Sequence, residues 1–314
     1  MACIRKLGHE LVSDPAESDL VIVHEGPHYY ASILRDIPRA PGRKFVGYSV
    51  WETPQLPQRF IGGVRLMDAV WTCSEFSRRA FFPYVAARLL PHVVERPKVT
   101  REDMDWAMNR LGIMEQRRDS YYFYTIVDTV NPRKNILAML AAFAAAFPGK
   151  EDRVCLVVKQ YRLPQDLSGF PFVIDIPEPL TDGQIAALHV VCDAYVSTHH
   201  AEAWGLALSE AMSFGNPVIA TGYSGNMEFM TPENSFPVPY KITPVGEAMC
   251  RALPDLFLPE MTWADIDTVA LVQTLRKVWA HPVSREFCTH TVSSMNAFSS
   301  NAVCDRLAVL LASV

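Results

Sequence analysis

The sequence lacks several features that would assign it to a special class of protein. Its 314 residues include 29 Lys and Arg against 34 Asp and Glu, and this net charge of −5 gives no basic signature for nucleic acid. It has no run of about 18 apolar residues that could span a membrane, and its first residues do not resemble a signal peptide. We therefore expect a globular cytoplasmic protein, and leave peripheral contact with the inner face of a membrane open.

The seven cysteines show no ordered spacing, and no C-x-x-C pair occurs. Structural zinc sites and disulfide frameworks both show characteristic cysteine spacings. We therefore predict reduced thiols and neither a disulfide framework nor a metal site at Cys3, Cys73, Cys155, Cys192, Cys250, Cys288 and Cys304.

The sequence does contain enough apolar residues, 49% of the chain, for sizeable cores. A length of 314 residues predicts two domains. Short apolar runs alternate with helical patterns, which is typical of an α/β fold with parallel strands. We expect strands at residues 20–24, 44–51, 69–72, 121–127, 154–158, 172–176, 193–196, 217–220 and 236–240, and helices from Ser74 and at 102–111, 136–147, 181–188, 263–279 and 300–311.

The most informative stretch is residues 197–226. A strand precedes it at 193–196, a helical segment ends at Gly215, and a further strand at 217–220 leads into a Gly/Ser/Asn loop. This βαβ order brings the loops that follow both strands to one edge of a parallel sheet, where open α/β sheets bind ligands.

The residues of this stretch suit a sugar linked to a diphosphate. The helix after Trp204 directs free N–H groups at the loop, which favours a phosphate there, and Gly205 allows close approach. Glu202 precedes the helix and Glu210 lies about two turns further on, so the two carboxylates can accept hydrogen bonds from separate sets of hydroxyls.

A second group of candidates follows the strand at 121–127. Arg133 and Lys134 lie in a polar loop that opens the next helix, which is a suitable place for a diphosphate. Lys134 is our first choice for the phosphate contact and Arg133 the second. Lys159 ends the following strand and would add positive charge at the same edge.

These segments resemble retaining glycosyltransferases of family 4 (group 1). The family hallmark is two glutamates separated by seven residues, which Glu202 and Glu210 match. One subgroup has S-x-H-R-S-E-G-F-G-L before the helix and P-V-I-A-T-x-x-S-G-N after it. This chain departs from that pattern at His200 and Ala203. Further matches are Trp51-Glu52, Leu56-Pro57, residues 71–78, and the sequence R-K-N at 133–135.

The resemblance implies the GT-B fold, with two Rossmann-like domains facing a cleft. We expect an unusually short acceptor-side domain at 1–95, a linker at 96–120, the donor-binding domain at 121–285, and a helical segment at 286–314 that crosses back to the first domain. Family members carry an upstream half-domain with a glycine-rich loop. No such loop precedes Asp19, so either the domain is small or the chain is part of a longer protein.

The implied reaction is transfer of a hexose from a nucleoside diphosphate sugar to a hydroxyl, with retention and without a metal or other cofactor. The subgroup leans towards GDP-mannose, while UDP-sugars stay open. The acceptor would be a glycan, a lipid-linked molecule or another hydroxyl compound, met on the acceptor side by His24 and Glu52. Glu202, Lys134 and Arg133 are the predicted catalytic residues; the donor-binding residues are Lys159, His200, Trp204, Gly205, Leu206, Glu210, Ser224, Gly225 and Asn226.

Two other functions remain open at this point. One is a non-catalytic module or scaffold that binds a nucleotide sugar, which the short first domain and Ala203 favour. The other is a GT-B enzyme of a different type, an epimerase or a phosphorylase.

Overall fold

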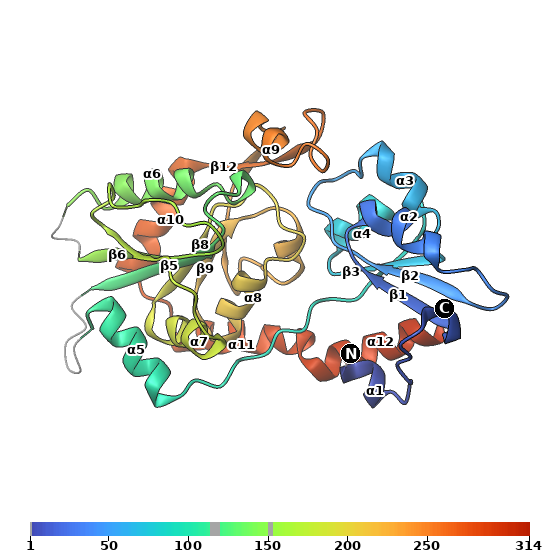
Figure 1. The fold of residues 1–314 in the computed structure, drawn as a ribbon. Coiled ribbons are helices and arrows are strands. Elements are labelled where there is room, and N and C mark those ends of the chain that lie inside the picture. Colours follow the sequence, from blue (N-terminus) through green and yellow to red (C-terminus); the bar gives the residue numbers. More distant parts are fainter. Residues whose placement is uncertain (1, 114–119, 150–152) are drawn as a thin grey trace.

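The computed structural model describes residues 2–113, 120–149 and 153–314, which form two parallel β-sheets flanked by helices (Figure 1). The first sheet has the strand order β1-β2-β3-β4, and the second has the order β10-β9-β8-β5-β6-β7. The predicted α/β class is confirmed. Part of the predicted linker, residues 114–119, lies outside the described residues.

The first sheet consists of β1 (Leu20–His24), β2 (Lys44–Tyr48), β3 (Ala69–Thr72) and β4 (Ala86–Leu89). The second consists of β5 (Tyr121–Val127), β6 (Val154–Gln160), β7 (Val173–Ile176), β8 (Ala194–Ser197), β9 (Val218–Thr221) and β10 (Phe236–Val238), and a separate ribbon pairs β11 (Tyr240–Pro244) with β12 (Thr262–Ile266). The helices are α1 (Ala2–Lys6), α2 (Tyr30–Ile33), α3 (Gln58–Val64), α4 (Glu75–Phe81), α5 (Arg101–Leu111), α6 (Ile136–Ala146), α7 (Asp182–Val191), α8 (Leu206–Ser213), α9 (Glu247–Ala252), α10 (Thr268–Ala280), α11 (Arg285–Ser294) and α12 (Ser300–Ala312).

Two predicted helix starts are confirmed by their caps. The Ser74 side chain accepts a hydrogen bond from the Ser77 N–H at the start of α4. At the start of α7, Thr181 and Gln184 form a reciprocal capping box. Such caps satisfy N–H groups that the first turn of a helix leaves without partners.

The second sheet is buried on both faces. Phe123 and Leu156 contribute to an apolar cluster with residues of α6 and α10 on one face. Tyr124 and Tyr195 contribute to a cluster with residues of α5, α7 and α8 on the other. Successive residues of a strand point to opposite faces, so the continuous apolar run of β5 supplies both cores.

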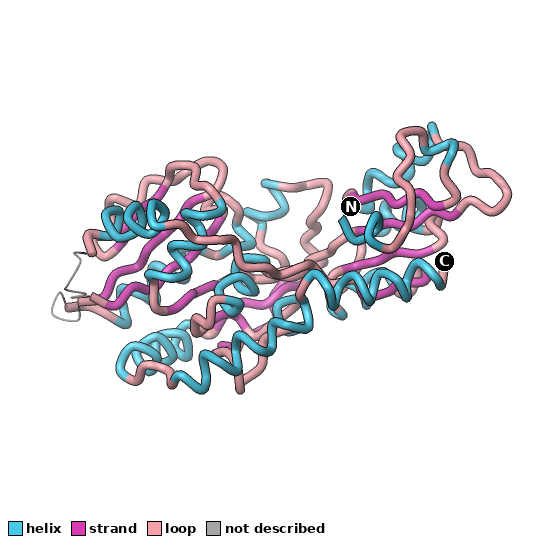
Figure 2. The backbone as a smooth tube through the Cα atoms, turned by 90° about the horizontal axis from the view of Figure 1, so that it is seen from below, coloured by secondary structure: helices cyan, strands magenta, loops and turns pink. Residues whose placement is uncertain are grey.

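The first sheet is covered by α2, α3 and α4 on one face and by α12 on the other. Leu307 and Leu310 of α12 share a cluster with Val46 and Trp71 of the sheet, and α12 runs along the underside of the molecule (Figure 2). None of the helices in the described ranges is long and apolar enough to cross a membrane.

The two halves of the chain also share one apolar core. Trp51, which follows β2, stacks on Phe257 with ring centroids 6.0 Å apart and an interplanar angle of 14°. The same cluster contains Phe60 and Val70 from the first half and Met261 and Trp263 from the second. This continuous cluster, here called the apolar seam, joins the first sheet to the β11–β12 ribbon.

The helix expected at 263–279 begins later than its sequence pattern indicates. Residues 262–266 form β12, which pairs antiparallel with β11, and α10 begins at Thr268. Asp267 is the N-cap, and its carboxylate accepts from the N–H groups of Val269 and Ala270. Trp263, Ala264 and Ile266 are buried while Asp265 is exposed. Buried residues three apart, as at Trp263 and Ile266, resemble the first turn of an amphipathic helix.

The prediction that all the cysteines are reduced is wrong for one pair. Cys3 of α1 and Cys304 of α12 form a disulfide across a sequence separation of 301 residues. The packing of α1 on α12 brings the two thiols together. A pair at opposite ends of the chain leaves no spacing pattern in the sequence, which is why the prediction missed it.

Replacing Cys304 with Ser should lower the free energy of unfolding by about 2–5 kcal/mol, because the disulfide restricts the unfolded chain. Urea unfolding under non-reducing conditions measures this, and dithiothreitol should produce a similar loss in the wild type. The matched control is Cys288→Ser, which changes a half-buried thiol outside any disulfide. If the wild type unfolds at the same urea concentration with and without reductant, the bridge does not stabilise the fold.

Candidate active site

The strand order of the second sheet reverses between β5 and β8. From β5 the chain continues through β6 to β7 on one side, whereas β8, β9 and β10 lie on the other. The loops after β5 and β8 diverge at the carboxyl edge of the sheet, where a ligand can enter. Arg133 and Lys134 lie in the first loop, within a short 3-10 turn, and Glu202 lies in the second.

Four charged side chains meet at this point, and we call them the cleft cluster: Glu52, Arg133, Lys134 and Glu202. The Lys134 Nζ forms an ion pair with Glu202 Oε1. Arg133 Nη1 lies 3.1 Å from Glu202 Oε2, and Arg133 Nη2 lies 3.5 Å from Glu52 Oε1. Glu52 follows β2, so the cluster joins the two sheets through charge.

Glu202 is buried and still ionised. Burial alone would raise the pKa of its carboxyl, but Lys134 and Arg133 outweigh that effect and hold the pKa well below its usual range. Burial alone would lower the pKa of the Arg133 guanidinium, but Glu202 and Glu52 outweigh that effect and raise it. Buried charges are tolerated when each has a partner, and here the partners alternate in sign.

Ser224, Gly225 and Asn226 hold the Glu202 loop in place. The Glu202 N–H donates to Ser224 Oγ at 2.7 Å, and the Gly225 N–H donates to the Glu202 carbonyl at 2.7 Å. The Asn226 Oδ1 lies 3.0 Å from His199 Nε2, and the Asn226 side chain is fully buried. The structure therefore engages these predicted donor-binding residues within the protein, where they support the loop.

Gly205 and Leu206 form the exposed start of α8. Gly205 has φ +93°, a left-handed conformation that favours glycine, and its carbonyl accepts from the Leu208 and Ser209 N–H groups. Leu206 is half exposed. The first N–H groups of the helix have no partner within it and carry partial positive charge.

Two predicted donor-binding residues, Trp204 and His200, have side chains that pack against aromatic rings of the protein. Trp204 is 2% exposed, packs against Phe229 and Phe298, and donates its indole N–H to Ser209 Oγ. His200 stacks on Trp263 with ring centroids 4.2 Å apart. His200 Nδ1 also lies 2.7 Å from the Ala264 carbonyl. That these two residues bind the donor stays a prediction.

Lys159 is also buried. Its Nζ donates to the Gln160 carbonyl and lies 5.0 Å from the centroid of the Tyr161 ring. Burial lowers the pKa of Lys159 despite the nearby carboxylates of Glu178 and Asp175. Within the described ranges, no ion pair joins Lys159 to the cleft cluster.

Glu210 projects from α8 and keeps 38% of its side chain exposed. Burial of the remainder, followed by the nearby carboxylate of Asp182, raises the pKa of Glu210 to about 7. Its Oε2 lies 3.9 Å from Nε2 of His189, a buried residue of α7. This carboxylate therefore changes charge near neutral pH, whereas Glu202 stays ionised.

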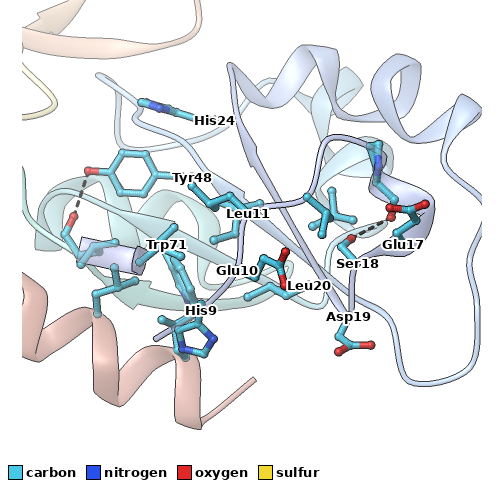
Figure 3. A pocket seen from close by; sticks show the side chains of 18 residues that line it. His9, Glu10, Leu11, Glu17, Ser18, Asp19, Leu20, His24, Tyr48 and Trp71 are labelled. Carbon is cyan, nitrogen blue, oxygen red and sulfur yellow. Dashed lines mark hydrogen bonds between the residues drawn. The ribbon is translucent and has the colours of Figure 1, made fainter. Parts of the chain in front are cut away.

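Among the residues that the structure describes, no ion pair or hydrogen bond joins His24 to the cleft cluster. His24 ends β1, its ring meets Tyr48 edge-on at 4.9 Å, and it lines a cavity of about 750 Å³ against the first sheet. Leu20, Trp71 and Tyr48 line the same cavity, as do residues of α12 and of the segment between α1 and β1 (Figure 3). Of the predicted site residues, His24 is the one that lines this cavity.

Residues 172–242 match the family described as "Glycosyl transferases group 1". No curated protein matches the chain in sequence. Many solved structures share its fold, and three of them illustrate the likeness. Sucrose-phosphate synthase from Thermosynechococcus elongatus has a TM-score of 0.69 at 17% identity, over 94% of this chain and 73% of that one.

The second is a UDP-forming trehalose-phosphate synthase from Burkholderia vietnamiensis, with a TM-score of 0.66 at 12% identity over 93% of this chain and 71% of the other. The third, the Anabaena protein HepE in complex with UDP and glucose, has a TM-score of 0.63 at 16% identity over 95% and 79%. The chain has the GT-B fold of these structures, and its match to the group 1 glycosyltransferase family is confined to residues 172–242. The predicted fold is thereby confirmed.

This GT-B chain also contains contacts between its halves that the sequence did not indicate. The Ala203 carbonyl accepts a hydrogen bond from Ser74 Oγ at 2.6 Å and from Cys73 Sγ at 3.2 Å. The Glu228 carboxylate accepts from the Glu75 N–H at 2.8 Å, at the start of α4. Ser74 was recognised as a helix cap, but its second bond joins loops far apart in the sequence, which no local pattern shows.

Gly225→Ala should destabilise the protein by about 2 kcal/mol or more and disturb the Glu202 loop, because overpacking a rigid site forces backbone shifts. A Cβ at Gly225 would lie 1.8 Å from the Ala203 carbonyl oxygen. The control is Gly62→Ala in α3, where nothing lies within 4 Å of the added Cβ. Chemical unfolding compares the two variants; equal stability would show that the Gly225 contact can relax.

Proposed function

We propose that this chain transfers a hexose from a nucleoside diphosphate sugar to a hydroxyl acceptor, with retention at the anomeric carbon. The bond from the anomeric carbon to the phosphate oxygen breaks, and a bond to the acceptor oxygen forms. The acceptor proton passes to the departing diphosphate. The observation that carries the proposal is the pairing of Lys134 with Glu202 at the reversal point of the second sheet.

The two residues suit the two ends of the donor. Lys134 is a quarter exposed, so its ammonium can turn from Glu202 to a diphosphate as negative charge develops there. Glu202 stays ionised and can accept hydrogen bonds from sugar hydroxyls. The free N–H groups at the start of α8 add further stabilisation of the phosphates.

Arg133, which the sequence suggested as a second phosphate contact, is proposed to have a different role. Its guanidinium is 10% exposed and is occupied by Glu52, Glu202 and the Ala201 carbonyl. We therefore assign it to orienting Glu202, and leave the phosphate contact to Lys134. Glu210, eight residues after Glu202, is proposed to accept from the ribose hydroxyls.

The donor and acceptor classes are supported by similar structures. HepE was solved with UDP and glucose, and the S. aureus protein TarM, also similar in fold, was solved with UDP and a GlcNAc-glycerol compound. We propose a UDP- or GDP-sugar donor, including GDP-mannose, and a glycan or lipid-linked acceptor on the Glu52 side. We propose that no metal is required and that the protein acts in the cytoplasm, in peripheral contact with a membrane if the acceptor is lipid-linked.

The test is a thermal-shift panel of UDP, GDP, ADP and their sugar conjugates, followed by a donor-hydrolysis assay. A ligand that binds the native state raises the melting temperature. Lys134→Ala should abolish the rise and lower turnover by about 100-fold or more, the scale for loss of one oxyanion-stabilising group. The control is Lys241→Ala, an exposed lysine of β11. Binding without turnover would favour the non-catalytic module, and no binding would reject the donor site.

Donor binding should strengthen as pH rises from about 6 to 8, because ribose hydroxyls donate to the ionised form of Glu210. With a pKa of about 7, this carboxyl is mostly neutral at pH 6 and mostly charged at pH 8. We expect up to a tenfold gain in affinity across this window, since about a tenth of the group is ionised at the lower pH. Isothermal titration measures it, and Glu210→Gln should flatten the profile; a wild-type affinity independent of pH would contradict the assignment.

A further inference from the structure

Beside Glu210 lies a hydrogen-bonded chain of three polar side chains, two of them buried and the third, Asn216, partly buried. Asn216 Nδ2 lies 2.7 Å from the Tyr124 hydroxyl and 2.7 Å from the His189 carbonyl. The Tyr124 hydroxyl lies 2.6 Å from His189 Nδ1. Tyr124 is fully buried and His189 is 2% exposed, so water does not replace these bonds.

The chain fixes where the protons are. A carbonyl oxygen only accepts, so the Asn216 atom beside the His189 carbonyl must be the amide nitrogen. That nitrogen donates one proton to the His189 carbonyl and the other to the Tyr124 oxygen. The Tyr124 hydroxyl must then donate its own proton to His189 Nδ1. His189 is therefore the neutral tautomer that carries its proton on Nε2.

This Nε2–H has no hydrogen-bond partner within the described part of the chain. The Glu210 Oε2 lies 3.9 Å from it, slightly beyond hydrogen-bonding distance. The imidazole ring cannot turn away, because it stacks on Phe214 with an interplanar angle of 16° and meets the Tyr124 ring edge-on. A buried donor without a partner is costly, and a small rotation of Glu210 would satisfy it.

We propose that His189 is a positioning residue that holds the Glu210 carboxylate, through Nε2–H, in the orientation that accepts the ribose hydroxyls of the donor. The inference rests on the proposed function. A neutral donor suits the task, because it orients the carboxylate without neutralising its charge. Glu210 Oε2 faces His189 Nε2, which leaves Oε1 to accept from the ligand.

The consequence is selectivity for ribose. A carboxylate held at one oxygen presents the other in a fixed direction, so a nucleotide that lacks the 2′-hydroxyl loses a preformed hydrogen bond. A site built to bond a hydroxyl rejects the analogue that lacks it much more strongly than an unordered site does. His189 should therefore contribute to the preference for ribose while contributing little to the affinity for the deoxy analogue.

The test compares the affinity of the full chain for the nucleoside diphosphates UDP, GDP and ADP with that for their 2′-deoxy forms, by isothermal titration. We expect the wild type to prefer the ribose form by about tenfold, the scale for one hydrogen bond to a charged group. His189→Phe should lose most of this preference with unchanged affinity for the deoxy form, and Tyr124→Phe should lose part of it. The control is Thr291→Val, a buried polar residue outside this network.

A second measurement uses the wild type alone, so its result is independent of whether any variant folds. Nitrogen NMR of labelled histidine should show His189 protonated at Nε2, with a signal that shifts on addition of the ribose nucleotide and much less with its 2′-deoxy form. The nitrogen chemical shifts of Nδ1 and Nε2 distinguish the two tautomers, and a proton on Nδ1 would overturn the inference.

The outcomes separate the two proposals. If no nucleoside diphosphate binds, both the proposed function and the role of His189 fail. If nucleotides bind through Lys134 but His189→Phe keeps the full ribose preference, only the role of His189 fails. If the wild type binds the ribose and 2′-deoxy forms equally, Glu210 does not bond the 2′-hydroxyl, and the inference fails.

Discussion

The ionised carboxylate of Glu202, buried between two cations, is the interaction on which the rest of the site depends. Its oxygens are shared by Lys134 and Arg133 from the loop after β5, while its backbone is bonded to Ser224 and Gly225 after β9. Removing either cation would leave a buried charge with too few partners, which is far more costly than removing an exposed pair. The position of three loops is therefore tied to one charge.

The two glutamates of the site are separated by their surroundings. Glu202 has cations on both oxygens, which keep its pKa low. Glu210 has no cation partner within the described ranges, lies near the carboxylate of Asp182, and has a raised pKa. Glu202 therefore carries a permanent charge, whereas the charge of Glu210 changes near neutral pH. The difference arises from the neighbouring side chains that the fold supplies.

Much of this arrangement could be predicted from sequence, because it depends on local patterns. The strand at 121–127, the caps at Ser74 and Thr181, and the approach of the loops carrying Lys134 and Glu202 follow from apolar periodicity and from βαβ order. The fates of Trp204 and His200 could not be predicted. Both lie inside the glycosyltransferase-like motif, but their side chains pack on Phe298 and Trp263, far along the chain.

Dependence on distant contacts also explains the errors of the prediction. The Cys3–Cys304 disulfide and the Ser74–Ala203 hydrogen bond join segments whose separation in sequence is 301 and 129 residues. Contacts of this kind depend on how the halves pack, and no window of sequence contains both partners. The β12 strand was mistaken for helix because its partner β11 lies some twenty residues earlier, so its pairing was invisible locally.

The apolar seam between Trp51 and Phe257 bears on how the molecule can move. A rigid separation of the two halves would expose these rings and their neighbours to water, at about 25 cal/mol for each Å² of apolar surface. Rotation about the seam exposes much less. Because Glu52 of the cleft cluster directly follows Trp51 of the seam, separation of the halves would also break the ion pair between Glu52 and Arg133. The seam therefore favours rotation of the two halves over their separation.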